Sequence, residues 1–194
     1  MDDLTPTTTL EAVNAILATI SEAPLNTLEG VLEPDAALAQ LKLRQASRAL
    51  QLEGWSFNYE PDYTLSQNSE GKIAVPTNAL IVHFDGSTNY TTRGRYVYDT
   101  DTKSFDIGQD LVANITFFLP FDDLPEHARM LIFMKAGKSF QDQQLGEAIL
   151  RRFSESDIKE ANAMFMNIES TLLNLNLSST VTSVQNIRRF RRTN

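Results

Sequence analysis

Apolar residues at helical spacing predict two helices near the start of the chain. The first helix carries apolar residues three and four positions apart, at Leu10, Val13, Ile16, Leu17 and Ile20. Thr8 or Thr9 can cap its start, and Pro24 ends the run. The second helix begins at Pro34 and ends at Gly54, a residue suited to a helix C-terminus. Its apolar positions are Leu38, Leu41, Ala46, Ala49 and Leu52.

Between residues 55 and 119 the chain becomes richer in β-branched and aromatic residues, with Asn, Asp, Gly and Thr between them. We expect strands over residues 55–59, 80–84 and 112–118. The second should be buried and end at the Asp85-Gly86 turn, whereas the third has one polar face and ends at Pro120. Residues 96–98 and 104–107 are expected to pair as a hairpin, and residues 63–78 to form an irregular loop.

Helical spacing returns after Pro120. A third helix, capped by Asp122 or Asp123 and with Pro125 near its first turn, should end before Gly146. Its apolar positions are Ala128, Leu131, Ile132, Ala136 and Phe140. A fourth helix begins at Ser154, with Asp157 as an approximate capping-box partner. Its apolar residues follow heptad spacing, at Ile158, Ala161, Phe165, Ile168, Leu172 and Leu175.

The heptad positions form a narrow apolar seam, which another helix must cover. We favour packing against the first three helices of the same subunit, and a neighbouring subunit is the alternative. These elements predict an α+β fold, in which the N- and C-terminal helices form a helical bundle and the β-rich segment is an insertion in the middle. We assign residues 1–54 and 121–177 to the helical bundle and 55–120 to a β-rich subdomain. Residues 178–194, where the helical pattern is lost, are assigned to a flexible basic C-terminal tail.

The composition restricts the chemistry and the compartment of the chain. Cysteine is absent, which excludes disulfides, thiolate nucleophiles and cysteine metal clusters and fits folding in a reducing cytoplasm. The sequence has no secretion signal and no apolar run near the roughly 20 residues that a membrane helix needs. We therefore expect a soluble, unexported protein with no membrane partner.

Charge is distributed unevenly along the chain. Four of its 17 Lys and Arg residues lie within residues 188–192, which leaves 13 against 25 Asp and Glu and a net charge of −12 over residues 1–187. Such an acidic body repels phosphate and argues against a protein that grips DNA along its length. If DNA had to slide through a ring without sticking, an acidic or neutral lining would be the expected choice, so the charge is compatible with a channel.

The motifs offer little evidence for catalysis, because nucleophile-elbow, zinc-protease, phosphate-loop and dinucleotide patterns are absent from the sequence. His83 lies in the predicted strand 80–84, where a structural role is favoured. His127 lies in the first turn of an acidic helix, where we expect it to be solvated or paired with a carboxylate. Residues 99–106 place oxygen ligands at alternate positions, as a calcium loop does, but Lys103 takes a ligand position and favours a polar hairpin turn. We predict no cofactor and no metal.

Glycan hydrolysis is the enzymatic alternative, because it requires only two carboxylates. Asp122, Asp123 and Glu126 form the best-placed cluster. They are the catalytic candidates if the chain is a glycan hydrolase that degrades capsule polysaccharide. Acidic residues before and inside the first turn of a helix also stabilise the helix dipole and its amides, and we favour this role.

An ordered series of segments resembles the tail tubular protein A family of short-tailed bacteriophages. The resembling segments are residues 12–14, 16–18, 21–24, 27–30, 54–58, 93–99, 122–126 and 135–140. The resemblance covers roughly residues 10–146 and fades afterwards. It depends on similarity in the same order over a long stretch, and no short catalytic motif is involved.

The resemblance implies a structural virion protein that is not an enzyme. It implies an adaptor ring of about twelve copies between the portal protein and the tail tubular nozzle protein. The helical part would face the portal, the β part would face the nozzle and tail fibres, and DNA would pass through the lumen without specific binding. The implied location is the virion tail, assembled in the host bacterial cytoplasm.

The end of the chain is a candidate partner-binding segment to which the resemblance does not extend. Phe190 is flanked by Arg188 and Arg189 before it and by Arg191 and Arg192 after it. The guanidinium groups can clamp carboxylates of a portal subunit, with Phe190 as an apolar anchor. Contact with DNA phosphate and a frayed, solvated terminus are the alternatives.

Overall fold

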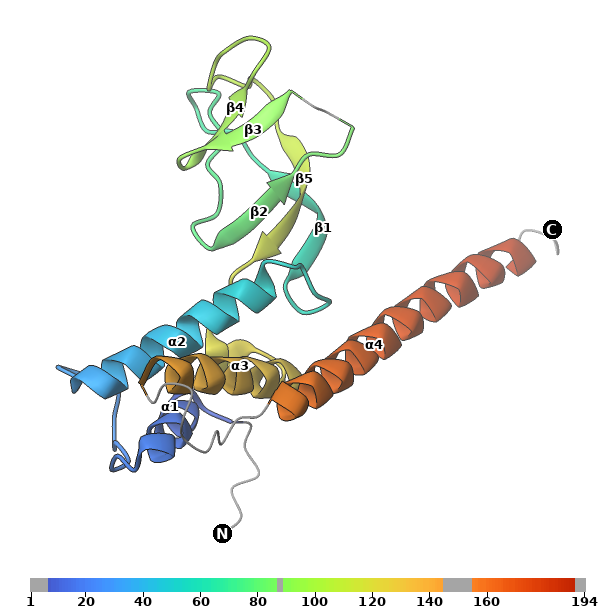
Figure 1. Ribbon diagram of the computed structural model, residues 1–194. Helices are drawn as coiled ribbons and strands as arrows, with labels where there is room; N and C mark the ends of the chain where they lie inside the picture. Colours follow the sequence, from blue (N-terminus) through green and yellow to red (C-terminus); the bar gives the residue numbers. More distant parts are fainter. Residues whose placement is uncertain (1–6, 87–88, 145–154, 191–194) are drawn as a thin grey trace. The chain divides into compact units, whose positions relative to one another are not determined.

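The computed structural model describes residues 7–86, 89–144 and 155–190, with side chains in the last helix as far as residue 173 (Figure 1). Helices at both ends of the sequence flank a β-rich middle, so the predicted α+β class is confirmed. Contacts divide the chain into two compact units, which we call the helical unit (residues 1–46 and 125–194) and the β unit (residues 47–124). The sequence had placed these boundaries at 54/55 and 120/121.

Helix α1 (Thr9–Leu17) begins and packs as its sequence predicts. Thr8 caps it in a reciprocal capping box: its hydroxyl accepts the backbone N–H of Glu11 at 3.2 Å, and the Glu11 carboxylate accepts the backbone N–H of Thr8 at 2.7 Å. A 3-10 turn, η1 (Ala18–Ile20), follows, and Ser21 adopts a left-handed conformation with φ of 63°. The helix therefore ends before Pro24. Its buried residues are Ala12, Val13, Ile16 and Leu17.

The buried face of helix α2 (Pro34–Gln51) differs from the prediction. Leu41 and Leu52 were expected inside and are 47% and 42% exposed. The buried positions are Ala36, Ala39, Leu43, Ser47, Leu50 and Gln51. Apolar residues occur around the whole helix, so spacing alone does not select a face. Ser47 and Gln51 tolerate burial because the Gln51 amide donates to the Ser47 hydroxyl at 2.9 Å and bonds the backbone of Leu119.

Helix α3 (Glu126–Gln144) contacts both α1 and α4 within the helical unit (Figure 1). All five predicted apolar positions are fully buried, at Ala128, Leu131, Ile132, Ala136 and Phe140. The predicted cap was wrong: Asp122 and Asp123 belong to a separate 3-10 turn, η2 (Phe121–Asp123). Leu124 is extended, and the first backbone acceptor of α3 is the carbonyl of Pro125, 2.9 Å from the nitrogen of Ala128.

Helix α4 (Glu155–Phe190) packs on α3 of the same chain, as the favoured interpretation of its seam predicted. Its predicted start, Ser154, lies outside the described residues. Phe165 is buried, Ile158, Ala161 and Ile168 are half-buried, and Leu172 is 38% exposed, while the side chain of Leu175 is not among those described. The helix continues through residues 178–190, where the sequence predicted no helix. Arg191 and Arg192 lie outside the described residues.

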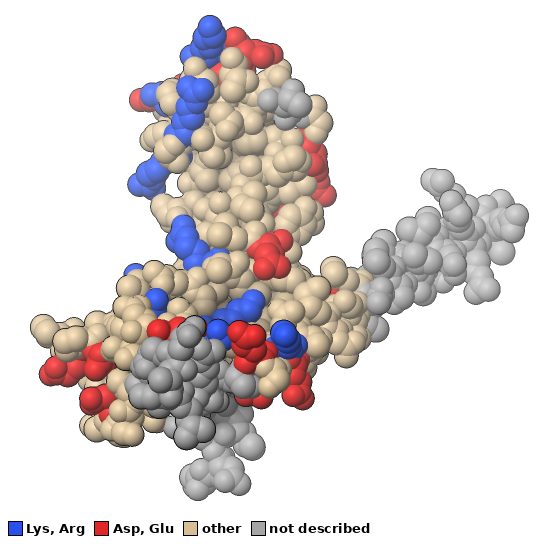
Figure 2. Space-filling view, viewed as in Figure 1, with Lys and Arg blue, Asp and Glu red and all other residues tan. Residues whose placement is uncertain are grey.

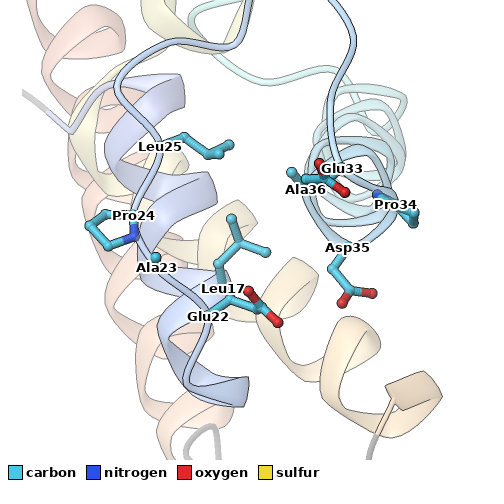
Figure 3. Close-up of a pocket in the computed structure, with 9 residues that line it drawn as sticks. All are labelled: Leu17, Glu22, Ala23, Pro24, Leu25, Glu33, Pro34, Asp35 and Ala36. Carbon is cyan, nitrogen blue, oxygen red and sulfur yellow. The ribbon is translucent and has the colours of Figure 1, made fainter.

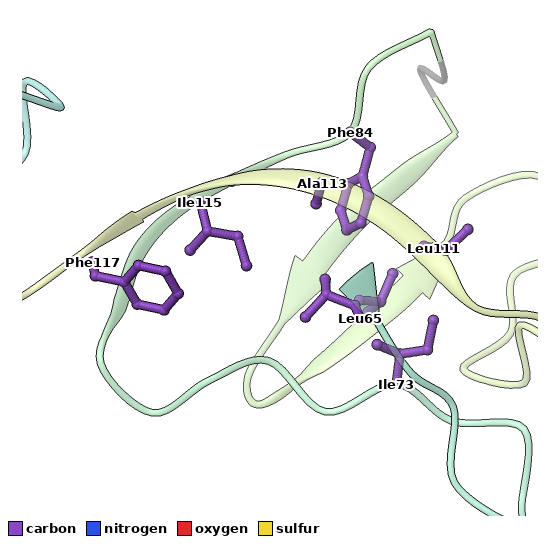
Figure 4. Close-up of a cluster of buried hydrophobic side chains, with 8 residues drawn as sticks. Leu65, Ile73, Phe84, Leu111, Ala113, Ile115 and Phe117 are labelled. Carbon is purple, nitrogen blue, oxygen red and sulfur yellow. The ribbon is translucent and has the colours of Figure 1, made fainter. Parts of the chain in front are cut away.

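The β unit contains a three-stranded antiparallel sheet in the order β1 (Tyr59–Leu65), β5 (Leu111–Phe117), β2 (Ala79–His83). A separate hairpin joins β3 (Tyr90–Arg93) to β4 (Tyr96–Asp99). The central strand β5 alternates as predicted, and its buried face joins residues from loops and neighbouring strands in one core (Figure 4). The core comprises Leu65, Ile73, Phe84, Val97, Leu111, Ala113, Ile115 and Phe117.

Three strand predictions were wrong in detail. Residues 55–58 form a turn closed by the Asn58 side chain, and β1 instead runs to Leu65, so only residues 66–78 form the expected loop. β4 pairs with β3 across Gly94, and residues 104–107 contribute only one bridge, between Asp99 and Ser104. β2 is half-exposed because it lies at an edge of the sheet.

Candidate functional site

The three carboxylates considered for glycan hydrolysis are divided between the two units. Asp122 and Asp123 are exposed on η2 of the β unit, and Glu126 is exposed at the start of α3 in the helical unit. A glycosidase needs one carboxyl kept protonated by an apolar setting, and none of these three is buried. Glu126 is also engaged elsewhere, because its carboxylate accepts the backbone N–H of Thr7 at 2.9 Å and the Thr7 hydroxyl at 2.7 Å.

Arg129 completes this attachment of the N-terminal segment. Its side chain is nearly buried, at 8% exposure, and donates to the backbone carbonyl of Thr7 at 2.9 Å. Glu126 and Arg129 thus hold Thr7, next to the cap of α1, against the first turn of α3. The sequence analysis did not single out Arg129, although a charged residue directly beside the buried position 128 was a possible signal.

His127 and Glu169 form a buried pair between α3 and α4. His127 Nε2 lies 2.8 Å from Glu169 Oε1, and their side chains are 13% and 2% exposed. The Phe165 ring packs beside the imidazole, with 5.4 Å between ring centroids. The predicted carboxylate pairing of His127 is confirmed, but in a buried setting. Glu169 was not predicted, because it adjoins the apolar seam and reads from sequence as a solvated residue.

His83 lies in the other unit, on β2, with an exposed side chain. Its Nε2 is 3.3 Å from an Asp85 carboxylate oxygen. The two histidines therefore belong to separate environments, each facing a carboxylate. Neither arrangement supplies the ordered nucleophile and base that acyl-transfer catalysis needs.

The segment that resembled a calcium loop is a polar turn, as predicted. The Asp99 carboxylate accepts the backbone N–H of Asp101 at 2.8 Å, and this hydrogen bond lowers the pKa of the Asp99 carboxyl below its usual value. Lys103 adopts a left-handed conformation with φ of 56° in the same turn. Within the described residues, no three His, Asp or Glu side chains lie close enough to hold a metal ion.

A pocket of about 360 Å³ in the helical unit lies where the segment after α1 faces the start of α2 (Figure 3). Leu17, Leu25 and Ala36 supply apolar lining, and Glu22 and Asp35 approach from its two sides (Figure 3). The Asp35 carboxylate accepts a hydrogen bond from the amide of Gln144. The carboxylates of Glu22, Glu33 and Asp35 make the opening of this pocket acidic, but its lining contains no nucleophile.

A second concave surface lies between α3 and α4 and is rich in methionine. Met130 and Met164 are 47% and 62% exposed and line it together with Met134, Ala161 and Phe165. Methionine side chains are flexible and polarizable, and exposed groups of them are typical of protein-binding surfaces. The sequence analysis identified the seam of α4 but not this groove.

The structure leaves the candidate partner-binding arginines largely outside its description. Arg188, Arg189 and Phe190 belong to the last turn of α4, and nothing is described of their side chains. Arg191 and Arg192 lie beyond the described residues. Their proposed contacts therefore stay predictions.

Comparison with known proteins places the chain in a family. The family model of tail tubular proteins matches residues 10–174, which include parts of both units. Tail tubular protein A of Klebsiella phage KP34 is 31% identical over 124 residues, which cover 63% of this chain and 66%, just under two thirds, of that protein. No described helix is long and apolar enough to cross a bilayer. The chain therefore belongs to the tail tubular protein family, a family of structural proteins of the phage tail.

Proposed function

We propose that the chain is the adaptor subunit that joins the portal to the tail nozzle and forms part of the DNA ejection channel. The observation that carries the proposal is the family match over residues 10–174, because it includes all five strands, α2, α3, all but the first residue of α1 and the first part of α4. A structural protein of the tail functions by binding other virion proteins through several of its surfaces. The exposed methionine groove is one surface of the helical unit that is available for such contacts.

The proposed mechanism is geometric. Each subunit would present its helical unit to the portal, its β unit to the nozzle and tail fibres, and two unlike sides to its neighbours, so that head-to-tail contacts close into a ring of about twelve. The excess of Asp and Glu over Lys and Arg, 25 against 17, favours a lumen that does not retain DNA. The ring would be assembled in the host bacterial cytoplasm.

The basic C-terminal segment is our proposed portal contact. Arg188, Arg189, Arg191 and Arg192 would bind carboxylates of a portal subunit bidentately, with Phe190 in an apolar depression. Arg188, Arg189 and Phe190 belong to the last turn of α4.

Deletion of residues 186–194 is expected to leave the fold intact, because the family match ends at residue 174, and to weaken binding to the portal. Circular dichroism tests the first expectation, and co-sedimentation with purified portal protein tests the second. The matched control replaces Arg188, Arg189, Arg191 and Arg192 by Lys, which keeps the charge and removes the bidentate geometry. Binding by the truncated chain that equals the full chain would exclude this contact.

The adaptor proposal itself is tested by native mass spectrometry and electron microscopy of the full chain, alone and with portal. Rings, formed alone or on the portal, are expected, without release of sugar from capsule polysaccharide in a parallel assay. A chain that remains a monomer with the portal and degrades the polysaccharide would overturn the proposal.

A further inference from the structure

The β unit carries opposite charges on two of its edges. In Figure 2, Lys and Arg gather mainly along one edge of this unit, and Asp and Glu lie mainly at its top and along the other edge. We call the first the arginine edge and define it by Arg93, Arg95, Tyr96, Tyr98 and Phe105. We call the second the acidic edge and define it by Asp62 and Asp85, which Asn114 links across the outward face of the three-stranded sheet.

The arginine edge is ordered by its own side chains. Arg93 and Arg95 flank Gly94 at the β3–β4 turn, where Gly94 has a left-handed φ of 64°. The Arg93 guanidinium carbon lies 3.7 Å from the centroid of the Tyr98 ring, and Phe105 packs edge-on against that ring at 5.0 Å. A guanidinium stacked in this way is held in place while its N–H groups stay available to an anion.

Neither arginine of this edge has a carboxylate within ion-pair distance in the part of the chain that the structure describes. Tyr96 and Phe105 beside them are 41% and 38% exposed. Next to Arg95 the surface is hollowed into a pocket of about 330 Å³, lined by Val75, Pro76, Thr77 and Ala79. The edge therefore combines unpaired cations, exposed rings and an apolar depression, a composition typical of protein interfaces.

The acidic edge is built on the three-stranded sheet. Asn114 in the middle strand accepts the backbone N–H of Asp62 at 3.1 Å and donates its amide to the Asp85 carboxylate at 2.7 Å. Asn114 thereby links Asp62 of β1 to Asp85 after β2. Strands β1, β2 and β5 contain no Lys or Arg. Their outward face also exposes large apolar side chains, at Tyr59, Ile81 and Val112.

We propose that the arginine edge of one copy binds the acidic edge of the next copy, head to tail. The inference rests on the proposed function, for which it supplies the contact between neighbouring subunits. The two edges carry opposite charges and both expose apolar groups, and unlike patches on one subunit give a heterologous contact that propagates from copy to copy. A second copy is favoured over DNA as the occupant because the chain has a net charge of −8 and carries a matching acidic edge.

Charge reversal tests the contact in the full chain. Arg93→Glu with Arg95→Glu makes both edges acidic. Asp62→Asn with Asp85→Arg makes the acidic edge positive, and Asn is used at position 62 because it tolerates the left-handed φ of 55° there. We expect each double variant to weaken self-association at least about tenfold, and an equimolar mixture of the two, or the quadruple variant, to recover it. Lys42→Glu with Arg44→Glu is the matched control for the arginine reversal, since it makes the same change in net charge on α2, which forms no part of either edge.

Sedimentation velocity at about 50 and 500 mM NaCl, alone and with the portal protein, provides the measurement, because exposed ion pairs weaken as salt screens them. The inference is supported if assembly weakens at high salt, weakens in each double variant and is recovered in the quadruple variant. The inference is overturned if neither reversal changes assembly. It is also overturned if the wild-type chain is monomeric both alone and with the portal protein. Reversals that lower DNA retention and leave assembly unchanged would assign the arginine edge to phosphate and also overturn it.

The same experiment separates this inference from the adaptor proposal. Copies of the chain that bind the portal in equal number whether or not the edges are reversed would support the adaptor and overturn the edge contact. A chain that does not bind the portal, but whose salt-dependent self-association is weakened by the reversals, would support the edge contact and overturn the adaptor proposal.

Discussion

Among single residues, Asn58 organises the junction between α2 and the sheet within the β unit. It is 2% exposed, its amide nitrogen donates to the carbonyls of Gln51 at 2.9 Å and Phe117 at 2.8 Å, and its amide oxygen accepts the N–H of Trp55 at 2.8 Å. Asn58→Asp conserves the volume but turns an oxygen toward two carbonyls. We expect it to lower the free energy of unfolding by about 2–3 kcal/mol or more.

The measurement for Asn58→Asp is urea unfolding followed by the fluorescence of Trp55, which is the single tryptophan of the chain. Asn78→Asp is the matched control, because Asn78 is exposed and its amide makes only a long, 3.4 Å hydrogen bond. Equal losses in the two variants would contradict the role given to Asn58.

Glu169 is the second such residue, because a buried carboxylate is unfavourable unless it has a partner, which here is His127. Glu169→Ala removes the partner of His127 in a site where the two side chains are 2% and 13% exposed. We expect a loss of about 3–5 kcal/mol in the free energy of unfolding, and a smaller loss for Glu169→Gln, whose amide can still hydrogen-bond the imidazole. Urea unfolding followed by circular dichroism checks both, and an equal cost for the two variants would show that the packing of α4, not the pair, determines stability there.

Among the elements, helix α3 is held in place by its row of buried side chains, and α4 covers only part of the surface of α3. Phe140 is fully buried on α3, whereas Met130 on the same helix is 47% exposed. Phe140→Ala is expected to cost about 3–5 kcal/mol through the lost contacts and the cavity left behind. Met130→Ala should cost well under about 1 kcal/mol and serves as the control. Thermal unfolding of both variants is the measurement, and similar melting temperatures would refute the difference.

The elements also show which patterns could be predicted. The stripe of α3 was predicted correctly because its buried residues recur three and four positions apart, and the strand β5 was predicted correctly because Ala113, Ile115 and Phe117 alternate with more polar neighbours. The face of α2 was not, because apolar residues surround that helix and the buried Gln51 is satisfied only by Ser47 and Leu119, which spacing does not show. The pairing of β4 with β3 was missed because it depends on the Gly94 turn. The pairing of His127 was predicted in kind, but its partner Glu169 lies 42 residues away.

At the scale of the whole molecule, the surface features that suggest function depend on pairings between distant segments. The arginine edge exists because β4 pairs with β3 and brings Arg95 beside residues 75–79, and the acidic edge exists because β5 lies between β1 and β2. A count of charges along the chain shows an acidic body and a basic end. It does not show that the central residues separate their charges on two edges (Figure 2), and it is this separation on which the proposed contact between unlike sides of neighbouring copies rests.

Each unit of the molecule has its own core, which predicts that the two will not unfold together. Trp55 lies in the β unit, so its fluorescence reports that unit, whereas far-UV circular dichroism is dominated by helices, three of which lie entirely in the helical unit. In urea we expect two unfolding curves that do not coincide.

Ile115→Ala, in the core of the β unit, should lower the fluorescence midpoint, and Phe140→Ala should lower the midpoint measured by circular dichroism. Coincident curves that move together in both variants would mean that the chain unfolds as one cooperative body. Separate transitions would let each proposed contact, the portal contact of the helical unit and the edge contact of the β unit, be impaired without unfolding the other unit.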